Sequence, residues 1–187
     1  MPETPSSFAG PAKNVGTRRV RLYTPEERYR RDHTYWTFVQ GVLAPIQFIV
    51  FLASLGCVLR YLATGEGLAI ANNSVIAKTV ILYTIMITGC IWEKVVFGRY
   101  LFAPAFFWED VFSMLVLALH TAYLVGTFKG LLSGPELMYL ALAAYAAYAV
   151  NAGQFILKLR AARLEHEEIQ REALRTLTPP KLEMVSV

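Results

Sequence analysis

The sequence predicts an all-α integral membrane protein: a four-helix bundle with a short N-terminal interfacial helix and a cytoplasmic extension of its last helix. Composition is the first reason, because 55% of the 187 residues are hydrophobic and only 17% are charged, whereas soluble domains carry nearer a quarter. The second reason is that the charges gather at both ends of the chain. The third is that four nearly uncharged runs each reach the roughly 20 residues that cross a bilayer.

The chain is predicted to divide into a leader, a membrane domain and a tail. The leader, residues 1–22, is rich in Pro and Ser and has no apolar core, so we expect it to be disordered and not a secretory signal. The membrane domain covers residues 23–164. The tail, residues 165–187, continues the last helix into water until Thr178-Pro179-Pro180.

The membrane domain begins with a helix-start pattern and continues with the four spans. Thr24 precedes Pro25, Glu26 and Glu27, which is typical of a capped helix with Pro in its first turn. This predicts a short interfacial helix followed by Tyr35 and Trp36 at headgroup level. The predicted spans cover residues 38–60, 75–94, 109–128 and 136–158.

Basic residues predict the orientation of the spans. Fifteen Lys and Arg residues lie before the first span, in the second connection or after the fourth span, whereas three lie on the other side, namely Arg60, Lys78 and Lys129. By the positive-inside rule both termini and the connection between the second and third spans are cytoplasmic. Basic ends beside lipid also account for the net charge of +4, so the charge does not indicate a nucleic-acid partner.

Neither cysteine predicts chemistry. Cys57 lies toward the outer end of the first span and Cys90 toward the inner end of the second. We expect them at different depths, without a disulfide, as small buried apolar residues. No paired Cys/His spacing indicates a metal site of the protein's own.

Polar residues inside the spans should face the bundle interior, because lipid makes them costly. Gln40, Gln47 and Ser54 recur every seven residues on the first span. Tyr145, Tyr148, Asn151 and Gln154 follow at steps of three on the fourth. Hydrogen bonding between helices is the favoured interpretation of the Gln, Ser and Thr residues. Contact with a bound ligand is the alternative, for which the candidates are Gln47, Tyr148 and Asn151.

Three acids and one histidine are harder to explain as bundle contacts. Glu109 and Asp110 open the third span, and Glu93 lies across the same inner connection. His120 follows eleven residues after Glu109, about 16 Å deeper along a helix. One acid can stabilise the helix N-terminus, but capping does not need two. His120 has three interpretations: a structural hydrogen bond, a proton carrier, or a ligand to the metal of a tetrapyrrole.

The inner connection is unusually aromatic for a segment that must turn the chain, with Gly98 and Pro104 as its breakers. It can form a lip for a flat, partly apolar substrate from the inner leaflet, or an ordinary aromatic belt. Lys94 and Arg99 are candidates to receive the carboxylate of such a ligand. The aromatic residues of the lip are Trp92, Tyr100, Phe106, Phe107 and Trp108.

Three stretches carry a family resemblance: "TGEG", "TGCIWEKVVFGRYLFAPAFFWEDVFSMLVLALHTAYL" and "LALAAYAAYAVNAGQFILKLRAARL". Together they resemble the vinyl bacteriochlorophyllide hydratases of photosynthetic bacteria, over residues 23–164. The resemblance implies a multi-pass enzyme of bacteriochlorophyll synthesis in the cytoplasmic or intracytoplasmic membrane. It would hydrate the C3-vinyl group of chlorophyllide a, or of 3-vinyl bacteriochlorophyllide a, to a 3-(1-hydroxyethyl) group. Its partners would be this substrate, lipid and other enzymes of the pathway.

This reaction suits the candidate residues. It needs an acid, a base that orients water, and a fitted slot, and no nucleotide or flavin motif indicates a redox cofactor. We expect Glu109 to be the acid or base, because it shares a helix face with His120. Asp110 is rotated 100° away, so we expect it to cap the helix and act as an electrostatic neighbour of Glu109, with Glu93 opposite. His120 would be an axial ligand to the substrate's magnesium or a proton relay.

Two functions of other classes remain open at this point. A membrane protein with one buried histidine can bind and deliver a tetrapyrrole, as a carrier or assembly factor without catalysis. A small transporter or channel subunit is the weaker alternative, because the polar residues gather near the inner side and trace no path across.

Overall fold

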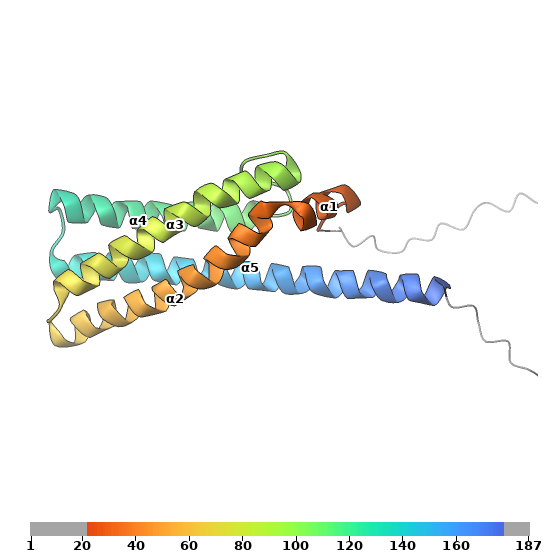
Figure 1. Ribbon diagram of the computed structural model, residues 1–187. Helices are drawn as coiled ribbons and strands as arrows, with labels where there is room; N and C mark the ends of the chain where they lie inside the picture. Colours follow the sequence, from red (N-terminus) through yellow and green to blue (C-terminus); the bar gives the residue numbers. More distant parts are fainter. Residues whose placement is uncertain (1–21, 178–187) are drawn as a thin grey trace, which may run out of the picture.

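The computed structural model describes residues 22–177, which form five α-helices (Figure 1). The helices are α1 (Pro25–His33), α2 (Tyr35–Thr64), α3 (Leu68–Phe97), α4 (Phe107–Lys129) and α5 (Gly134–Leu177). Helices α2 to α5 are long and apolar enough to cross a membrane, which confirms the predicted all-α membrane fold. Almost all of the predicted leader, and the tail from residue 178, lie outside the described residues.

Local sequence signals set the helix limits. The Thr24 hydroxyl accepts a hydrogen bond from the Glu27 amide at 3.2 Å, and the Glu27 carboxylate accepts one from the Thr24 amide at 2.8 Å. This confirms the predicted start of α1. Helix α3 begins before the predicted span because Asn72 does not break it. The Asn72 side chain accepts a hydrogen bond from the Tyr123 hydroxyl on α4 instead.

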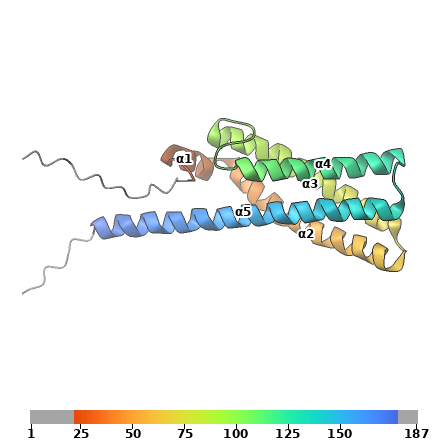
Figure 2. The same ribbon diagram turned by 180° about the vertical axis from the view of Figure 1, so that it is seen from behind.

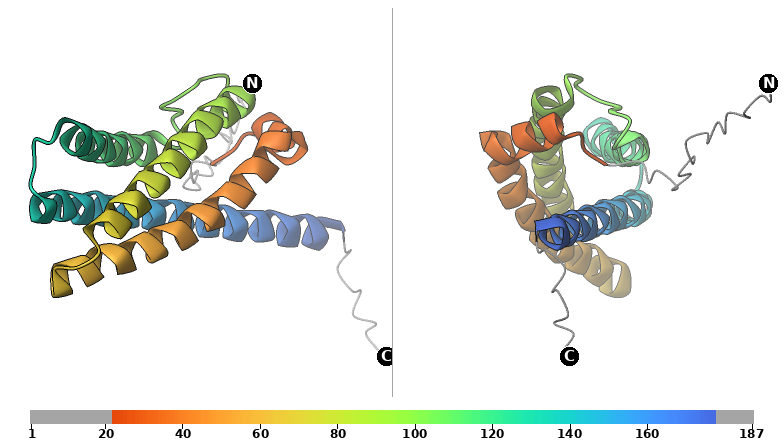
Figure 3. Two further views of the ribbon diagram at one scale, coloured as in Figure 1. Left: turned by 60° about the vertical axis from the view of Figure 1, so that its left-hand side comes forward. Right: turned by 90° about the vertical axis from the view of Figure 1, so that its right-hand side faces the viewer.

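The chain forms two antiparallel hairpins, α2–α3 and α4–α5, that cross each other (Figures 1 and 3). The short connections within the hairpins lie at one end of the molecule. Helix α1, the α3–α4 connection and the C-terminal half of α5 lie at the other (Figures 1 and 2). Small residues of α5, including Ala141 and Ala144, are fully buried where the hairpins meet, as expected of close helix contacts in membranes.

Lys78 does not lie on the outer side of the membrane, where the sequence pattern placed it together with Arg60 and Lys129. Lys78 is fully buried in α3, so it belongs to neither side of the membrane. Without Lys78 only Arg60 and Lys129 remain against the fifteen basic residues of the other side, and we propose that both termini face the cytoplasm. Reporter fusions to either terminus should therefore be active only when the reporter works in the cytoplasm. A fusion after Gly65, in the α2–α3 connection, should report the opposite side. Reversed signals at these positions would contradict the proposed orientation.

Candidate active site

The three predicted acids meet at the end of the bundle where the connection joins α3 to α4. Glu93 lies near the end of α3, while Glu109 and Asp110 lie in the first turn of α4. All three side chains are buried, with exposed fractions of 4–6%. The connection of residues 98–106 brings the two helix ends together. A carboxyl group is costly to bury without partners, so the partners of each acid indicate its role.

Glu93 and Asp110 form a pair. Their carboxyl groups bind consecutive amides of the connection, which places them beside each other. Asp110 also accepts a hydrogen bond from the Phe102 amide at 2.7 Å, and Glu93 accepts one from the Ala103 amide at 3.4 Å. Phe102 has φ +58°, a conformation that is rare for such a bulky side chain. Two carboxylates this close repel each other, so the pair is most stable with one proton between them.

The expected capping role of Asp110 is wrong. The N-cap residue of α4 is Phe106, and no side chain caps this helix. The Asp110 carboxyl binds the Phe102 amide in the connection instead. Helical angles alone could not show this, because the conformation of the connection decides which amide reaches the acid.

Glu109 has a different partner. Its carboxylate accepts a hydrogen bond from the Lys158 ammonium on α5 at 2.7 Å. The same ammonium donates to the Ala105 carbonyl and lies 4.9 Å from the centre of the Phe106 ring. In the sequence alone, Lys158 is one of the fifteen basic residues that predict the orientation. Its contact with Glu109 could have been inferred from the antiparallel α4–α5 hairpin, because such a hairpin places residues near Lys158 on α5 beside the first turn of α4.

The aromatic residues of the predicted lip divide into two groups. Phe106 is buried and contacts the half-buried Trp92, with 5.6 Å between ring centres. The Trp92 indole donates a hydrogen bond to the Thr37 hydroxyl at 2.9 Å. Tyr100, Phe107 and Trp108 are exposed. The sequence did not distinguish these groups, because all five residues lie in or beside one connection.

The two cations predicted to receive a carboxylate also lie at this end. Lys94 and Arg99 are both exposed. The Lys94 ammonium donates to the Gly98 carbonyl at 2.9 Å. It also lies 5.1 Å from the centre of the Tyr100 ring. Lys94 thus helps to end α3, which accounts for its position without a ligand.

His120 lies deeper, ten residues beyond Asp110, or about 15 Å along the helix. Its side chain is fully buried. Nδ1 lies 2.8 Å from the Val116 carbonyl oxygen, which can only accept, so Nδ1 carries the proton. Nε2 therefore presents a lone pair to the bundle interior, and it has no hydrogen-bond partner among residues 22–177. A neutral imidazole nitrogen of this kind suits a metal ion or a proton.

The remaining predicted ligand contacts line the same interior. Gln47, Tyr148 and Asn151 are all buried. Asn151 donates to the Ser113 hydroxyl at 2.9 Å, and Tyr148 contacts Phe51 with 4.8 Å between ring centres. The side-chain oxygens of Gln47 and Asn151 have no hydrogen-bond partner in the described part of the chain. Asn151 and Tyr148 thus contribute to helix contacts, while Gln47 and Asn151 still present oxygens that can accept a hydrogen bond.

Several other polar residues hydrogen-bond between helices, as the favoured interpretation predicted. Gln40 on α2 donates to Thr88 on α3 at 2.7 Å. The hydroxyl groups of Ser54 on α2 and Tyr145 on α5 share a hydrogen bond of 2.6 Å. Interhelical bonding is therefore confirmed for these pairs.

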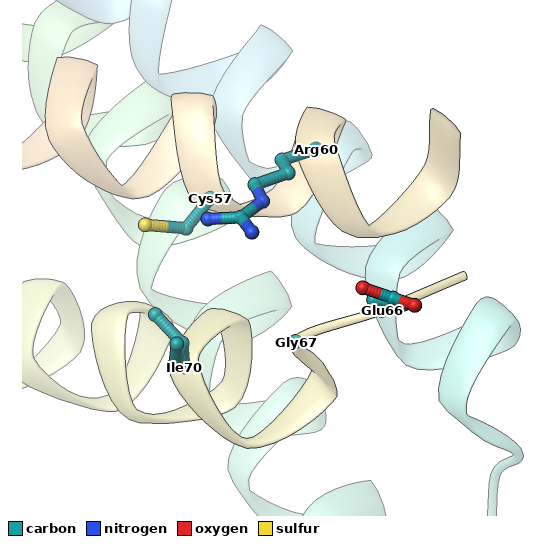
Figure 4. Close-up of a pocket in the computed structure, with 5 residues that line it drawn as sticks. All are labelled: Cys57, Arg60, Glu66, Gly67 and Ile70. Atoms are coloured by element: carbon teal, nitrogen blue, oxygen red, sulfur yellow. The ribbon is translucent and has the colours of Figure 1, made fainter. Parts of the chain in front are cut away.

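A small pocket opens at the opposite end of the bundle (Figure 4). It is lined by Cys57, Arg60, Glu66, Gly67 and Ile70 and encloses about 30 Å³, the volume of a single water molecule. It is therefore not a site for a large ligand. Cys57 and Cys90 are free thiols, and both are half-buried instead of fully buried as expected.

Comparison with known proteins identifies the family. The model of the 2-vinyl bacteriochlorophyllide hydratase family matches residues 23–161, which include all the site residues above. Relatives named 2-vinyl bacteriochlorophyllide hydratase from Cereibacter sphaeroides and Rhodobacter capsulatus are 67% and 63% identical to the chain. The alignments cover 80% and 79% of this chain and 93% and 85% of those relatives. No solved structure matches it. The chain belongs to the 2-vinyl bacteriochlorophyllide hydratase family, whose members are hydro-lyases.

Proposed function

We propose that this enzyme adds water across the C3-vinyl group of chlorophyllide a, or of 3-vinyl bacteriochlorophyllide a, to give a 3-(1-hydroxyethyl) group. The relatives are named for a 2-vinyl group, and we propose that this is the same vinyl group in another numbering of the macrocycle. The observation that carries the proposal is the buried Glu93–Asp110 pair inside the segment that matches the family. Such a pair combines a proton donor and a proton acceptor in one place.

The pair can perform both proton transfers of the reaction. One carboxyl group gives its proton to the terminal CH₂ of the vinyl group, and the positive charge forms on the carbon attached to the macrocycle. The macrocycle delocalises that charge. The carboxylate then takes a proton from the water that attacks this carbon, which restores the pair. No electron is gained or lost, so we propose that the enzyme needs no redox cofactor.

Glu109 receives a different role from the one expected. Its carboxyl group is already engaged by the Lys158 ammonium in a contact between α4 and α5, whereas Glu93 and Asp110 form no ion pair within the described residues. We therefore assign the proton transfers to Glu93 and Asp110. Glu109 and Lys158 hold the start of α4 against α5, and so position Asp110.

His120 is proposed to contact the macrocycle from within the bundle. Its unpaired Nε2 fits an axial ligand to the magnesium that the substrate carries, so no metal of the protein's own is required. The 15 Å of helix between His120 and Asp110 suits one ligand of macrocyclic size that contacts both. The exposed aromatic residues of the connection, Tyr100, Phe107 and Trp108, lie at the same end of the bundle as the acids and face the inner leaflet in the proposed orientation.

The reaction is tested by supplying chlorophyllide a to the expressed, membrane-inserted protein. The expected product is heavier by one water, and its absorption shows loss of the vinyl group. The contrasting function is the non-catalytic tetrapyrrole carrier. Unchanged pigment that co-purifies in stoichiometric amount would favour that carrier over the hydratase.

The His120→Ala variant separates the roles of this residue. If His120 is a magnesium ligand, its loss should weaken pigment binding. Added imidazole should then restore part of the binding, because imidazole can fill the space of the missing ring. Binding is measured by the pigment retained per protein and by its absorption shift. Nearly normal binding with slow turnover would instead indicate a proton relay. If only the melting temperature falls, His120 is a structural residue.

A further inference from the structure

Lys78 is a buried cation for which the proposed reaction has so far given no role. It lies in the middle of α3, its side chain is fully buried, and its ammonium nitrogen has no hydrogen-bond partner among the described residues. No carboxylate between residues 22 and 177 forms an ion pair with it. A charged group of this kind in a membrane interior is costly, so its presence needs a partner that the protein does not supply.

The surroundings of Lys78 come from three further helices and hold one more unsatisfied group. The Lys78 nitrogen lies 4.1 Å from the centre of the Tyr148 ring and 5.9 Å from that of Tyr145, both on α5. The His120 ring on α4 lies 5.9 Å from the Tyr145 ring, and its Nε2 also has no partner in the described chain. The Tyr145 hydroxyl is already bonded to Ser54 on α2, so it does not satisfy either nitrogen.

We propose that Lys78 binds an acceptor oxygen on the rim of the macrocycle, and so fixes which edge of the substrate faces the Glu93–Asp110 pair. This inference rests on the proposed function. The substrate offers two oxygens of the right chemistry, the ionised propionate and the ring ketone. The ammonium donates hydrogen bonds to such an oxygen, while His120 binds the magnesium and Tyr148 contacts the ring.

Lys78 is a better anchor than the exposed cations at the inner end. Lys94 is exposed and already donates to the Gly98 carbonyl, and exposed ion pairs contribute little. A hydrogen bond from a buried, otherwise unpaired ammonium is among the stronger polar contacts. Lys78 therefore favours one orientation of the macrocycle, which the inner surface alone would not do.

The test compares Lys78→Met with Lys129→Met, the same substitution at an exposed lysine in the last turn of α4. Lys78→Met should bind chlorophyllide a about 10- to 100-fold more weakly and yet be at least as stable to heat, because it removes an unpaired buried charge. Lys129→Met should bind normally. A Lys78→Met protein that loses stability but binds like wild type would overturn the proposal, since Lys78 would then be structural.

Measurements on the wild-type protein identify which substrate oxygen binds Lys78, and they do not depend on the folding of the Lys78→Met variant. If the propionate is the partner, the free acid should bind at least 10-fold more tightly than its methyl ester. If the ketone is the partner, its carbonyl stretching frequency should fall on binding. Equal binding of acid and ester, with an unshifted carbonyl, would refute Lys78 as an anchor. Failure of wild type to hydrate bound chlorophyllide a would refute the proposed function separately.

Discussion

Glu93→Gln and Asp110→Asn should each lower the hydration rate by about 10²-fold or more, the usual contribution of a positioned acid or base. Each amide keeps the shape of the side chain and an oxygen that can accept the backbone hydrogen bond from Ala103 or Phe102. Neither amide can hold the proton that the reaction transfers. The rate is measured under saturating chlorophyllide a, together with the melting temperature of each variant.

Glu109→Gln is the matched control for these two variants. It changes a neighbouring acid of the same cluster, but one that is paired with Lys158, so its rate should fall much less than 10²-fold. The melting temperatures of Glu93→Gln and Asp110→Asn should not fall, because the amide N–H can donate a hydrogen bond to the remaining carboxylate in place of the shared proton. If Glu109→Gln loses activity while the other two keep it, the acid or base is Glu109, as its face of the helix first indicated.

The number and approximate positions of the four spanning helices could be predicted from sequence, because they depend on local properties. Hydropathy and length give four spans without any knowledge of their contacts. The Thr24 cap depends on residues only three positions apart. Glu109 and His120, which were predicted to share one face of α4, are both buried.

The partners of the acids could not be predicted in the same way. Asp110 pairs with Glu93 because residues 98–106 turn the chain through a left-handed Phe102, and no angular argument on a single helix contains that turn. Glu109 meets Lys158 because of the register of the α4–α5 hairpin. Lys78 was counted with the outer charges because the positive-inside rule treats Lys as a loop residue, whereas burial by surrounding helices is a tertiary property.

Lys158→Met should be markedly destabilising. It leaves the Glu109 carboxylate and the Ala105 carbonyl without their donor in a part of the bundle where Glu109 is buried. Removing one partner of a buried ion pair costs about 3–5 kcal/mol, and the partial exposure of Lys158 lowers our expectation to about 2–3 kcal/mol. For a chain of this length the melting temperature in detergent should fall by about 5–10 °C.

A double variant and a surface control show whether the unpaired charge is the cause. Lys158→Met combined with Glu109→Met should regain most of the lost stability, because neither charge is then left alone. Arg171→Met breaks the exposed pair with Glu167 and should change the melting temperature by less than about 2 °C. A double variant as unstable as Lys158→Met would mean that Lys158 stabilises the site through Ala105 and Phe106. A double variant that is stable and still hydrates chlorophyllide a would confine the proton transfers to Glu93 and Asp110.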